Sequence, residues 1–114
     1  MSFPRRGEVY LADLDPVVGT EIAKTRPVLI ISNDIGNELS RRVIVAPITS
    51  KGTERVYPFE VLLAYGDGGL SRTSKALFDQ IRTLDKRRLG PRLGALPLER
   101  MELVGEAIRL SLAV

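Results

Sequence analysis

The sequence predicts a mainly β fold, in which a small, strongly bent sheet or barrel is followed by one C-terminal helix. Five or six short segments are rich in apolar and β-branched residues, and polar residues, glycine or proline separate them. A clear helical spacing of apolar residues appears only towards the C-terminal end. The chain has 114 residues, the length of an ordinary domain, so we expect residues 1–114 to form a single domain.

Two strands and a long loop are expected in the first third of the chain. Residues 7–14 alternate apolar and polar side chains, which is typical of a half-buried strand, and Asp15-Pro16 ends this segment. The polar residues that follow, up to Thr25, predict a loop of about ten residues, and loops of this length in small domains are often functional. Pro27–Ser32 is almost entirely apolar, so we expect it to be a central strand.

The middle of the chain continues as an alternation of strands and loops. Residues 33–40 favour a turn or a short helical loop, and residues 42–50 predict the next strand. Pro47 indicates an edge position or a bulge in that strand, because proline cannot donate to the hydrogen-bond ladder. A loop at residues 51–55 then leads to a further strand at residues 57–65.

The last third of the chain combines glycine-rich turns with the terminal helix. Residues 66–71, GDGGLS, predict a turn. Residues 74–85 fit either a helix or a strand, and we favour one strand because their side chains alternate. Gly90-Pro91 and Gly94 predict a break after it. Pro97 can open a helix, and the apolar residues beyond it recur at helical spacing: Met101, Val104, Ile108 and Leu112.

The composition excludes several kinds of chemistry. The chain has no cysteine, which excludes disulfides, cysteine-bound zinc and thiol catalysis. It also has no histidine, so paired-histidine ribonuclease chemistry, Ser-His-Asp hydrolysis and histidine metal sites are excluded. Acid–base work would fall to Asp, Glu, Lys, Arg, Tyr or a hydroxyl with a shifted pKa. No signal peptide or long apolar run is visible, so we expect a cytoplasmic protein with no membrane span.

The basic residues support two interpretations. The chain carries 17 basic and 14 acidic residues, a formal net charge of +3. Many basic residues lie in or beside expected loops, where they form either a solvated face or a groove that binds phosphates. These residues are Arg41, Arg42, Arg72, Lys75, Lys86, Arg87, Arg88 and Arg92.

Other candidate sites have a simpler structural explanation. Asp13 and Asp15 could bind a hard metal ion, but a strand end with an Asx turn before Pro16 explains them better, because no third carboxylate is near in sequence. The glycines of residues 66–69 lack the lysine and hydroxyl residue of a P-loop, so a hairpin turn is favoured over a phosphate cradle. The three tyrosines and three phenylalanines are expected to pack in the core rather than stack on bases.

Arg26 and Thr49 form the most informative combination. Arg26 precedes one expected strand and Thr49 ends the next, so antiparallel pairing would bring a guanidinium and a hydroxyl to one rim of the sheet. Glu21 precedes Arg26 by five residues, on the loop above that rim. Such a trio suits a phosphodiester, because the guanidinium binds two oxygens, the hydroxyl donates to one, and the carboxylate accepts a proton or fixes the arginine. An Arg–Glu ion pair that ties down the loop is the alternative.

At these residues the sequence resembles the MazF/PemK family of toxin endoribonucleases. The resemblance begins with RRGEVYLADLDPVVGTEIAKTRPVLIISNDIGN and continues through VIVAPITS and SKALFDQIRTLDKRRLG. It covers about residues 5–90 in matching order and spacing. The C-terminal segment contributes a helix in the expected place but little motif.

The resemblance implies both a fold and an activity. Members of this family have an SH3-like β-barrel of the CcdB/MazF type with a C-terminal helix, and they form homodimers. They cut single-stranded RNA, usually mRNA, at short sequence motifs, without a metal ion or other cofactor. The 2′-hydroxyl attacks its own phosphodiester and leaves a 2′,3′-cyclic phosphate and a 5′-hydroxyl. A MazE-like antitoxin inhibits the toxin by threading an acidic, extended tail over the RNA site.

The resemblance also implies roles for particular residues. The family's essential arginine falls on Arg26, its essential threonine on Thr49, and a glutamate whose role varies among members on Glu21. We expect Arg26 to stabilise charge first and to donate a proton second, because a guanidinium stays protonated under ordinary conditions and is therefore a poor acid. We predict RNA-binding residues around them: Lys24, Thr25, Ser50, Lys51, Arg55, Arg72, Ser74, Gln80 and Arg82.

Two other functions remain open on the sequence. A non-enzymatic toxin on the same scaffold, as in the CcdB proteins that bind DNA gyrase, would not need Arg26 and Thr49 together. A plain nucleic-acid-binding barrel would bind RNA in a salt-dependent way and leave it intact.

Overall fold

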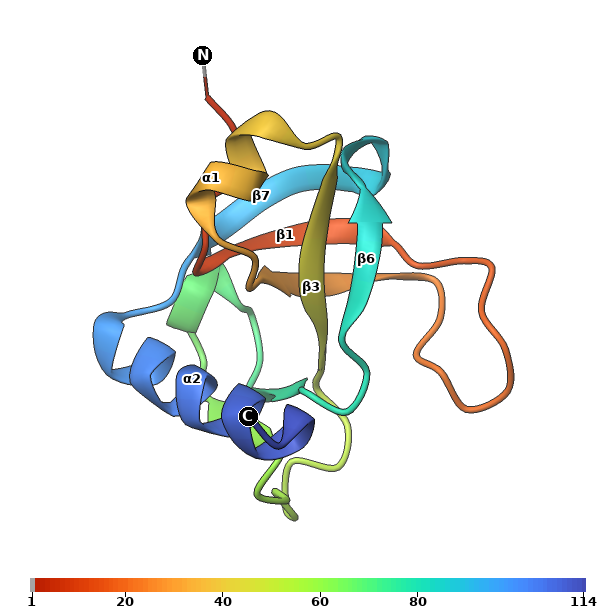
Figure 1. Ribbon diagram of the computed structural model, residues 1–114. Coiled ribbons are helices and arrows are strands. Elements are labelled where there is room, and N and C mark those ends of the chain that lie inside the picture. Colours follow the sequence, from red (N-terminus) through yellow and green to blue (C-terminus); the bar gives the residue numbers. More distant parts are fainter. Residues whose placement is uncertain (1) are drawn as a thin grey trace.

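The computed structural model describes residues 2–114, which form an antiparallel sheet followed by a C-terminal helix (Figure 1). The strands are β1 (Glu8–Asp13), β2 (Thr25–Ile30), β3 (Arg42–Thr49), β4 (Glu60–Leu63), β5 (Ser74–Leu77), β6 (Arg82–Asp85) and β7 (Leu89–Ala95). The helices are α1 (Asp34–Leu39) and α2 (Leu98–Leu112), and two short 3-10 turns are η1 (Asp67–Gly69) and η2 (Lys86–Arg88). The predicted mainly β fold with a C-terminal helix is confirmed.

The strands pair in the order β4-β5-β3-β2-β1-β7, and β6 pairs with β3 off this path. Every pair is antiparallel. Within residues 2–114 no pairing joins β4 to β7, so the sheet is bent but open. The predicted closed barrel is therefore not confirmed.

Pro47 lies inside β3, which is a central strand, so the prediction of an edge position is wrong. β3 pairs with β2 on one side, where Pro47 faces Val28. On its other side β3 changes partner: Arg42–Val45 pair with β6, and Ile48 and Thr49 pair with β5. Pro47 falls in the gap between these partners, where the missing N–H leaves no ladder bond unmade.

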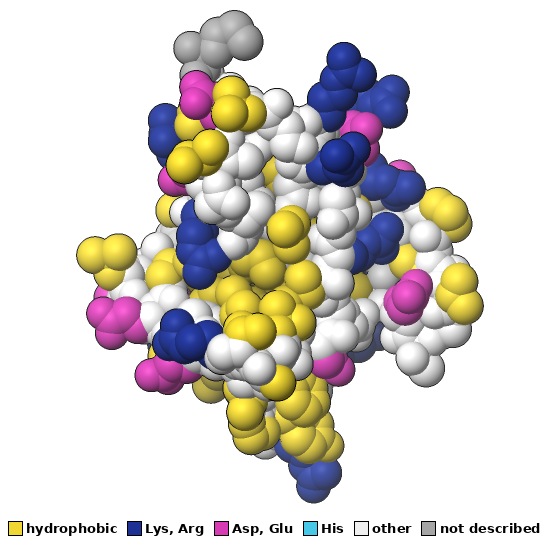
Figure 2. Space-filling model, in the orientation of Figure 1, with side chains coloured by type: hydrophobic (Ala, Val, Ile, Leu, Met, Phe, Trp, Pro, Cys, Tyr) yellow, Lys and Arg dark blue, Asp and Glu magenta, His cyan; other side chains and the backbone are white. Residues whose placement is uncertain are grey.

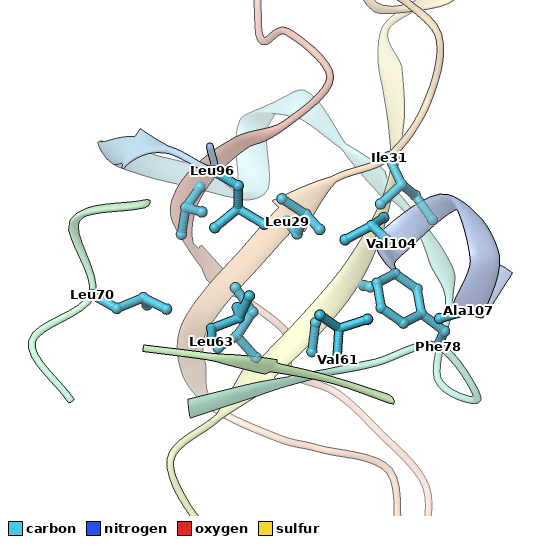
Figure 3. Close-up of a cluster of buried hydrophobic side chains, with 13 residues drawn as sticks. Leu29, Ile31, Val61, Leu63, Leu70, Phe78, Leu96, Val104 and Ala107 are labelled. Carbon is cyan, nitrogen blue, oxygen red and sulfur yellow. The ribbon is translucent and has the colours of Figure 1, made fainter. Parts of the chain in front are cut away.

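Strand β2 is buried on both faces, which explains why its sequence is apolar without alternation. Leu29 belongs to a hydrophobic cluster between the sheet and α2, shown in Figure 3, whereas Val28 and Ile30 belong to a second cluster on the other face. Other members of the first cluster include Ile31, Val61, Leu63, Leu70, Phe78, Leu96, Val104 and Ala107. The two clusters together fix where both ends of β2 lie.

Residues 74–85 were expected to form one strand, and that prediction is wrong. They form β5 and β6, which pair with different ends of β3 and are separated by a turn. In the turn the Phe78 ring is fully buried, its N–H donates to the carbonyl of Phe59, and Gln80 N–H donates to the carbonyl of Leu77. Burial of Phe78 redirects the chain, a tertiary effect that local alternation does not encode.

The sequence predicts a break at Gly90-Pro91 and Gly94, but this prediction is wrong, because these residues lie within strand β7. It is an edge strand paired only with β1, a position where proline is tolerated, and the register shifts on both sides of Tyr10. A Cβ on Gly94 would lie 2.7 Å from the carbonyl carbon of Gly68, so glycine is required for η1 to pack on β7. The glycines are thus close-packing residues within a strand rather than breakers.

The remaining predicted elements differ from those of the structure mainly in their boundaries. The strand predicted at residues 57–65 is shortened to β4, and the turn predicted at residues 66–71 lies in the β4–β5 connection. Helix α1 is the predicted short helical loop, with Asn33 capping it through a bond from Gly36 N–H.

Helix α2 starts after Pro97 and buries Val104 and Ala107, with Met101 and Ile108 partly buried against the same cluster. Leu112, predicted to be on the packed face, is 54% exposed, because the last turn of α2 extends past the core. Among residues 2–114, no helix is both long and apolar enough to span a membrane.

Candidate active site

Arg26 and Thr49 line one pocket at the rim where β2 begins and β3 ends. The β2–β3 register pairs Val28 with Pro47, and its continuation sets Arg26 opposite Thr49. The pocket has a volume of about 110 Å³. Its lining is Arg26, Pro27, Ile48, Thr49, Ser50, Leu70, Ser71, Arg72 and Ser74. The structure therefore brings together the guanidinium and the hydroxyl residue that the sequence placed at one rim.

The Arg26 side chain is half-buried and is oriented by the loop before it. Its Nε donates to the carbonyl oxygen of Ala23 at 3.1 Å. Among residues 2–114 neither terminal nitrogen of this guanidinium has a hydrogen-bond partner, and Glu21 does not pair with it. The alternative of an Arg26–Glu21 ion pair is thus wrong, and both terminal NH2 groups of the guanidinium remain available to an anion.

Thr49 is held by the loop that follows it. Its Oγ1 accepts a hydrogen bond from the backbone N–H of Lys51 at 3.1 Å. A hydroxyl has one donor besides its acceptor lone pairs, so the proton of Thr49 can still be donated to a ligand in the pocket. The Thr49 hydroxyl is therefore oriented by the loop and can still donate a hydrogen bond.

Three predicted RNA-binding residues complete the pocket on the side of β5. Ser50 and Arg72 are exposed, whereas Ser74 is buried and its Oγ donates to the carbonyl of Arg72 at 2.9 Å. Ser71 also lines this pocket, although the pattern GDGGLS predicts only a turn and carries no signal of a site. The pairing of β5 with the end of β3 is what brings this connection back to Thr49.

Glu21 lies in a neighbouring cleft and not in the Arg26 pocket. That cleft, of about 340 Å³, is lined by Glu21, Ile22, Asp79, Gln80, Ile81 and Arg82. The Glu21 carboxylate accepts the backbone N–H of Val18 at 2.8 Å, which fixes the turn of its own loop. Gln80 accepts the N–H of Ile22 at 2.8 Å, and Arg82 donates to the carbonyl of Leu14 at 3.0 Å. Gln80 and Arg82 thus anchor the β1–β2 loop.

Lys24 and Thr25 lie at the end of the same loop, and both are exposed. Lys24 has φ of 68°, and its backbone N–H donates to Asp15 at 2.9 Å while its carbonyl accepts the N–H of Leu14 at 2.9 Å. Thr25 begins β2 opposite Asp13. The backbone of Lys24 closes the base of the loop and leaves its side chain at the surface.

Asp13 and Asp15 have the structural role that was favoured over metal binding. Asp13 accepts the N–H of Asp15 at 3.0 Å, and Asp15 accepts the N–H of Lys24. Within the described part of the chain, no three acidic side chains are grouped as potential metal ligands. The two carboxylates shape the loop through backbone N–H groups.

The basic residues divide into exposed and structural sets. Lys51 and Arg55 are exposed on the β3–β4 loop, whereas Lys75, expected in or beside a loop, is buried within β5 and paired with Glu60 at 2.9 Å. Burial is possible because Glu60 neutralises the ammonium. Arg41 and Arg42 are exposed.

The cluster after β6 is mostly occupied by contacts within the fold. Lys86 donates to the carbonyl of Asn37, and Arg88 donates to the carbonyls of Asp13 and Asp15. The hydrogen-bonded Arg87 guanidinium holds the pKa of the Asp85 carboxyl below its ordinary value. Arg92 pairs with Glu8. These contacts favour a structural role over a phosphate groove at this end of the sheet.

The expectation that every aromatic ring packs in the core is wrong for two tyrosines. Tyr57 is 44% exposed on the β3–β4 loop, and Tyr65 is 74% exposed after β4. Phe78 is fully buried, as expected. Burial raises the pKa of the Tyr10 hydroxyl, with a smaller contribution from the nearby Glu8 carboxylate.

Comparison with known proteins relates this chain to endoribonuclease toxins. It is 46% identical over 110 residues to endoribonuclease EndoA of Bacillus subtilis (strain 168), covering 96% of this chain and 95% of that protein. It is also 46% identical over 110 residues to endoribonuclease MazF of Staphylococcus saprophyticus, covering 96% and 92%.

Solved structures show the same fold. MazF from Deinococcus radiodurans superposes with a TM-score of 0.85 at 27% identity over 100% of both chains. An endoribonuclease solved with its cognate antitoxin, from mycobacterial species, gives a TM-score of 0.82 at 30% identity over 97% of this chain and 96% of that one.

The family match spans nearly the whole chain. The model of the PemK-like, MazF-like toxins of type II toxin-antitoxin systems matches residues 5–112, which include every residue of the Arg26–Thr49 pocket. The match also includes α2, which carries little recognisable motif. The chain belongs to the PemK-like, MazF-like toxin family of type II toxin-antitoxin systems.

Proposed function

We propose that this protein is an endoribonuclease toxin that cuts single-stranded RNA, mRNA in the cell, at selected sequences in the cytoplasm. The observation that carries the proposal is the Arg26–Thr49 pocket, which is lined by both a guanidinium and an oriented hydroxyl. These are the groups that a phosphodiester undergoing substitution requires. The family to which the chain belongs supports the same reading.

The proposed reaction is attack of the RNA's own 2′-hydroxyl on the adjacent phosphorus. The bond from the 2′-oxygen to phosphorus forms and the bond to the 5′-oxygen breaks, which leaves a 2′,3′-cyclic phosphate and a 5′-hydroxyl. Arg26 stabilises the charge that builds on the non-bridging oxygens, and Thr49 donates its proton to one of them. No metal ion is required for this step, because the positive charge comes from Arg26.

Proton transfer in this scheme does not require Glu21 in the pocket. The pocket lining contains no carboxylate, and the Glu21 carboxylate is engaged with the backbone of Val18. We therefore assign the 2′-hydroxyl proton to water and give Glu21 a role in shaping the loop beside the substrate. The departing 5′-oxygen takes its proton from water or, secondarily, from Arg26.

The RNA strand is proposed to run from the pocket over the neighbouring loops. Ser50, Arg72 and Ser74 contact the nucleotides at the cut, and exposed Lys24, Thr25, Lys51 and Arg55 contact the flanking phosphates. Gln80 and Arg82 act more indirectly, because their described bonds hold the β1–β2 loop. The same exposed cations would attract the acidic tail of a MazE-like antitoxin, which would block the pocket by occupying it.

A second copy of the chain is the proposed partner for an apolar face beside α2. Figure 2 shows hydrophobic side chains gathered near the middle of this view, over β3 and the end of α2. The face contains a pocket of about 350 Å³ lined by Arg6, Ile31, Ile44, Ile81, Gly105, Ile108, Arg109 and Leu112. Ile44 is 41% exposed and Leu112 is 54% exposed, and a contiguous apolar face of this kind is typical of homodimer interfaces.

Light scattering tests the dimer. Ile44→Asp should convert the protein to a monomer, because it buries a charge in the interface. Ile35→Asp is the matched control, since Ile35 is 75% exposed on α1 and does not line that pocket, and it should leave the dimer intact. A monomeric wild-type protein at micromolar concentration would refute this proposal.

Cleavage of a long single-stranded RNA in excess chelator tests the activity. We expect discrete fragments with 2′,3′-cyclic phosphate and 5′-hydroxyl ends. Intact RNA that is bound in a salt-dependent way would favour a plain RNA-binding protein. Intact RNA together with capture of DNA gyrase would favour a non-enzymatic toxin of the CcdB type. Either outcome would overturn the proposed function.

A further inference from the structure

The loop between β3 and β4 presents an aromatic ring to solvent. Tyr57 is 44% exposed, and the ring of Phe59 stacks on it with a centroid distance of 5.4 Å and an angle of 2° between the planes. In Figure 2, hydrophobic side chains with a cation beyond them project at the lower end of the molecule, where Figure 1 places this loop. The exposed Tyr57 ring is thus packed against a second aromatic ring.

A buried ion pair holds the backbone that carries this ring. Lys75 Nζ donates to Glu60 at 2.9 Å and to the carbonyl of Arg55 at 3.0 Å, and it lies 5.9 Å from the centre of the Tyr57 ring. Glu60 also accepts the N–H of Tyr57 at 3.0 Å. The Lys75 and Glu60 side chains are only 10% and 7% exposed. The position of Tyr57 is therefore set before any ligand binds, which reduces the entropic cost of binding.

The same ion pair connects Tyr57 to the Arg26–Thr49 pocket. Lys75 is the cross-strand partner of Thr49 in the β3–β5 pair, and directly opposed residues project on the same face of a sheet. The residue that supports the Tyr57 ring is thus a direct neighbour of the threonine that we assign to the cleavage step. A strand of RNA that leaves the pocket along this face meets the β3–β4 loop.

The surroundings of Tyr57 favour single-stranded nucleic acid over another ligand. Arg55 donates to the Tyr57 hydroxyl at 3.4 Å, and the exposed Lys51 lies on the same loop. Surfaces that bind single-stranded RNA combine such cations, which contact phosphates, with aromatic faces on which bases stack. A buried apolar peptide side chain would not need the adjacent cations.

We propose that Tyr57 is a base-stacking residue, which binds one nucleobase of the RNA beside the cut. The proposal rests on the proposed endoribonuclease function and adds a subsite to it. Stacking on a ring depends little on which base is present, so this subsite contributes affinity and fixes the register of the strand. Lys75 and Glu60 are positioning residues for it, because they act on RNA only through Tyr57.

The test uses a short RNA that contains a mapped cleavage site and a 2′-deoxy nucleotide at the cut, so that it binds without reacting. The chain has three tyrosines and no tryptophan, so tyrosine fluorescence reports on binding directly. Binding should quench the wild-type signal. Tyr57→Phe should keep the affinity but lose most of the quenching, whereas Tyr65→Phe, which changes another exposed tyrosine, should keep both.

Affinity and kinetics give the second readout. Tyr57→Leu should weaken binding on the order of ten-fold and raise KM with little change in kcat. Removing the base at each position in turn should weaken wild-type binding most at one position, and that loss should disappear in Tyr57→Leu. Tyr65→Leu is the matched control and should bind like the wild type.

The outcomes separate the subsite from the enzyme. If the wild type cuts RNA but Tyr57→Phe retains full quenching, or Tyr57→Leu binds with wild-type affinity, the stacking proposal is refuted and the proposed function stands. If the wild type cuts no RNA, the proposed function fails first. Because Tyr57→Phe keeps the ring, its result does not depend on whether Tyr57→Leu folds.

Discussion

Replacement of Lys75 by methionine should lower the free energy of unfolding by about 3 kcal/mol. Methionine keeps most of the volume but removes the charge, and so leaves the Glu60 carboxylate unpaired at only 7% exposure. Breaking a buried pair by removing one partner costs about 3–5 kcal/mol. We take the lower end because Glu60 keeps its bond from the N–H of Tyr57. In a domain of this size the loss corresponds to about 12 °C in Tm.

Urea denaturation followed by circular dichroism measures this change. Arg87→Met is the matched control, because Arg87 also pairs with a carboxylate, that of Asp85, but its side chain is 91% exposed, and it should leave stability essentially unchanged. Lys75→Met combined with Glu60→Leu should recover part of the loss, because no unpaired charge remains. If Lys75→Met costs less than about 1 kcal/mol, the assignment of Lys75 as a buried structural cation is refuted.

Three further predictions concern the loops and the N-terminal segment. Gly69→Ala should lower stability by at least about 2 kcal/mol in urea denaturation, because its Cβ would lie 2.0 Å from a carbonyl oxygen of β7. Gly66→Ala is the control: its Cβ would meet no atom within 4 Å, so it should cost only the strain of its positive φ. The backbone N–H of Arg6 holds the pKa of Asp34 below its ordinary value, so this contribution to stability is present above about pH 4 and is lost as pH falls through the lowered pKa. Asp34→Asn should therefore destabilise the protein at neutral pH more than at about pH 3. An equal loss of stability at both pH values would contradict the assignment. Glu21→Gln should slow RNA cleavage less than ten-fold in single-turnover assays, because glutamine can still accept the loop N–H, and a larger loss would restore Glu21 as a base.

The position of the candidate site was predictable from sequence because antiparallel strands impose it. Arg26 precedes an apolar strand and Thr49 ends the next one, and pairing of neighbours then sets the two residues side by side. This inference needs only the order of the strands and no side-chain contact. Glu21 lies on the loop before β2, as predicted, but it lines the neighbouring cleft and not the Arg26 pocket. The sequence could not show this, because the loop conformation depends on a bond from Ile22 to Gln80, which is distant in sequence.

The role of Lys75 could not be predicted in the same way. A lysine beside a turn is usually exposed, and the sequence does not show that Glu60 will lie 2.9 Å away across the β4–β5 hairpin. The division of residues 74–85 into two strands was missed for a similar reason, since burial of Phe78 decides it. Local patterns thus predict the strand order, whereas contacts between distant residues decide which polar residues are buried.

Cleavage of an RNA with one mapped site, compared with the same RNA carrying a single 2′-deoxy nucleotide at that site, tests the central claim most directly. The Arg26–Thr49 pocket is proposed to act on a phosphodiester attacked by its own 2′-hydroxyl. The wild type should therefore cut the first RNA and leave the second bound but intact. Arg26→Ala and Thr49→Ala should each slow the cut by about 100-fold or more while keeping the melting curve of the wild type. Cleavage of the deoxy-substituted RNA at the same bond, or a wild-type rate in either variant, would contradict the account.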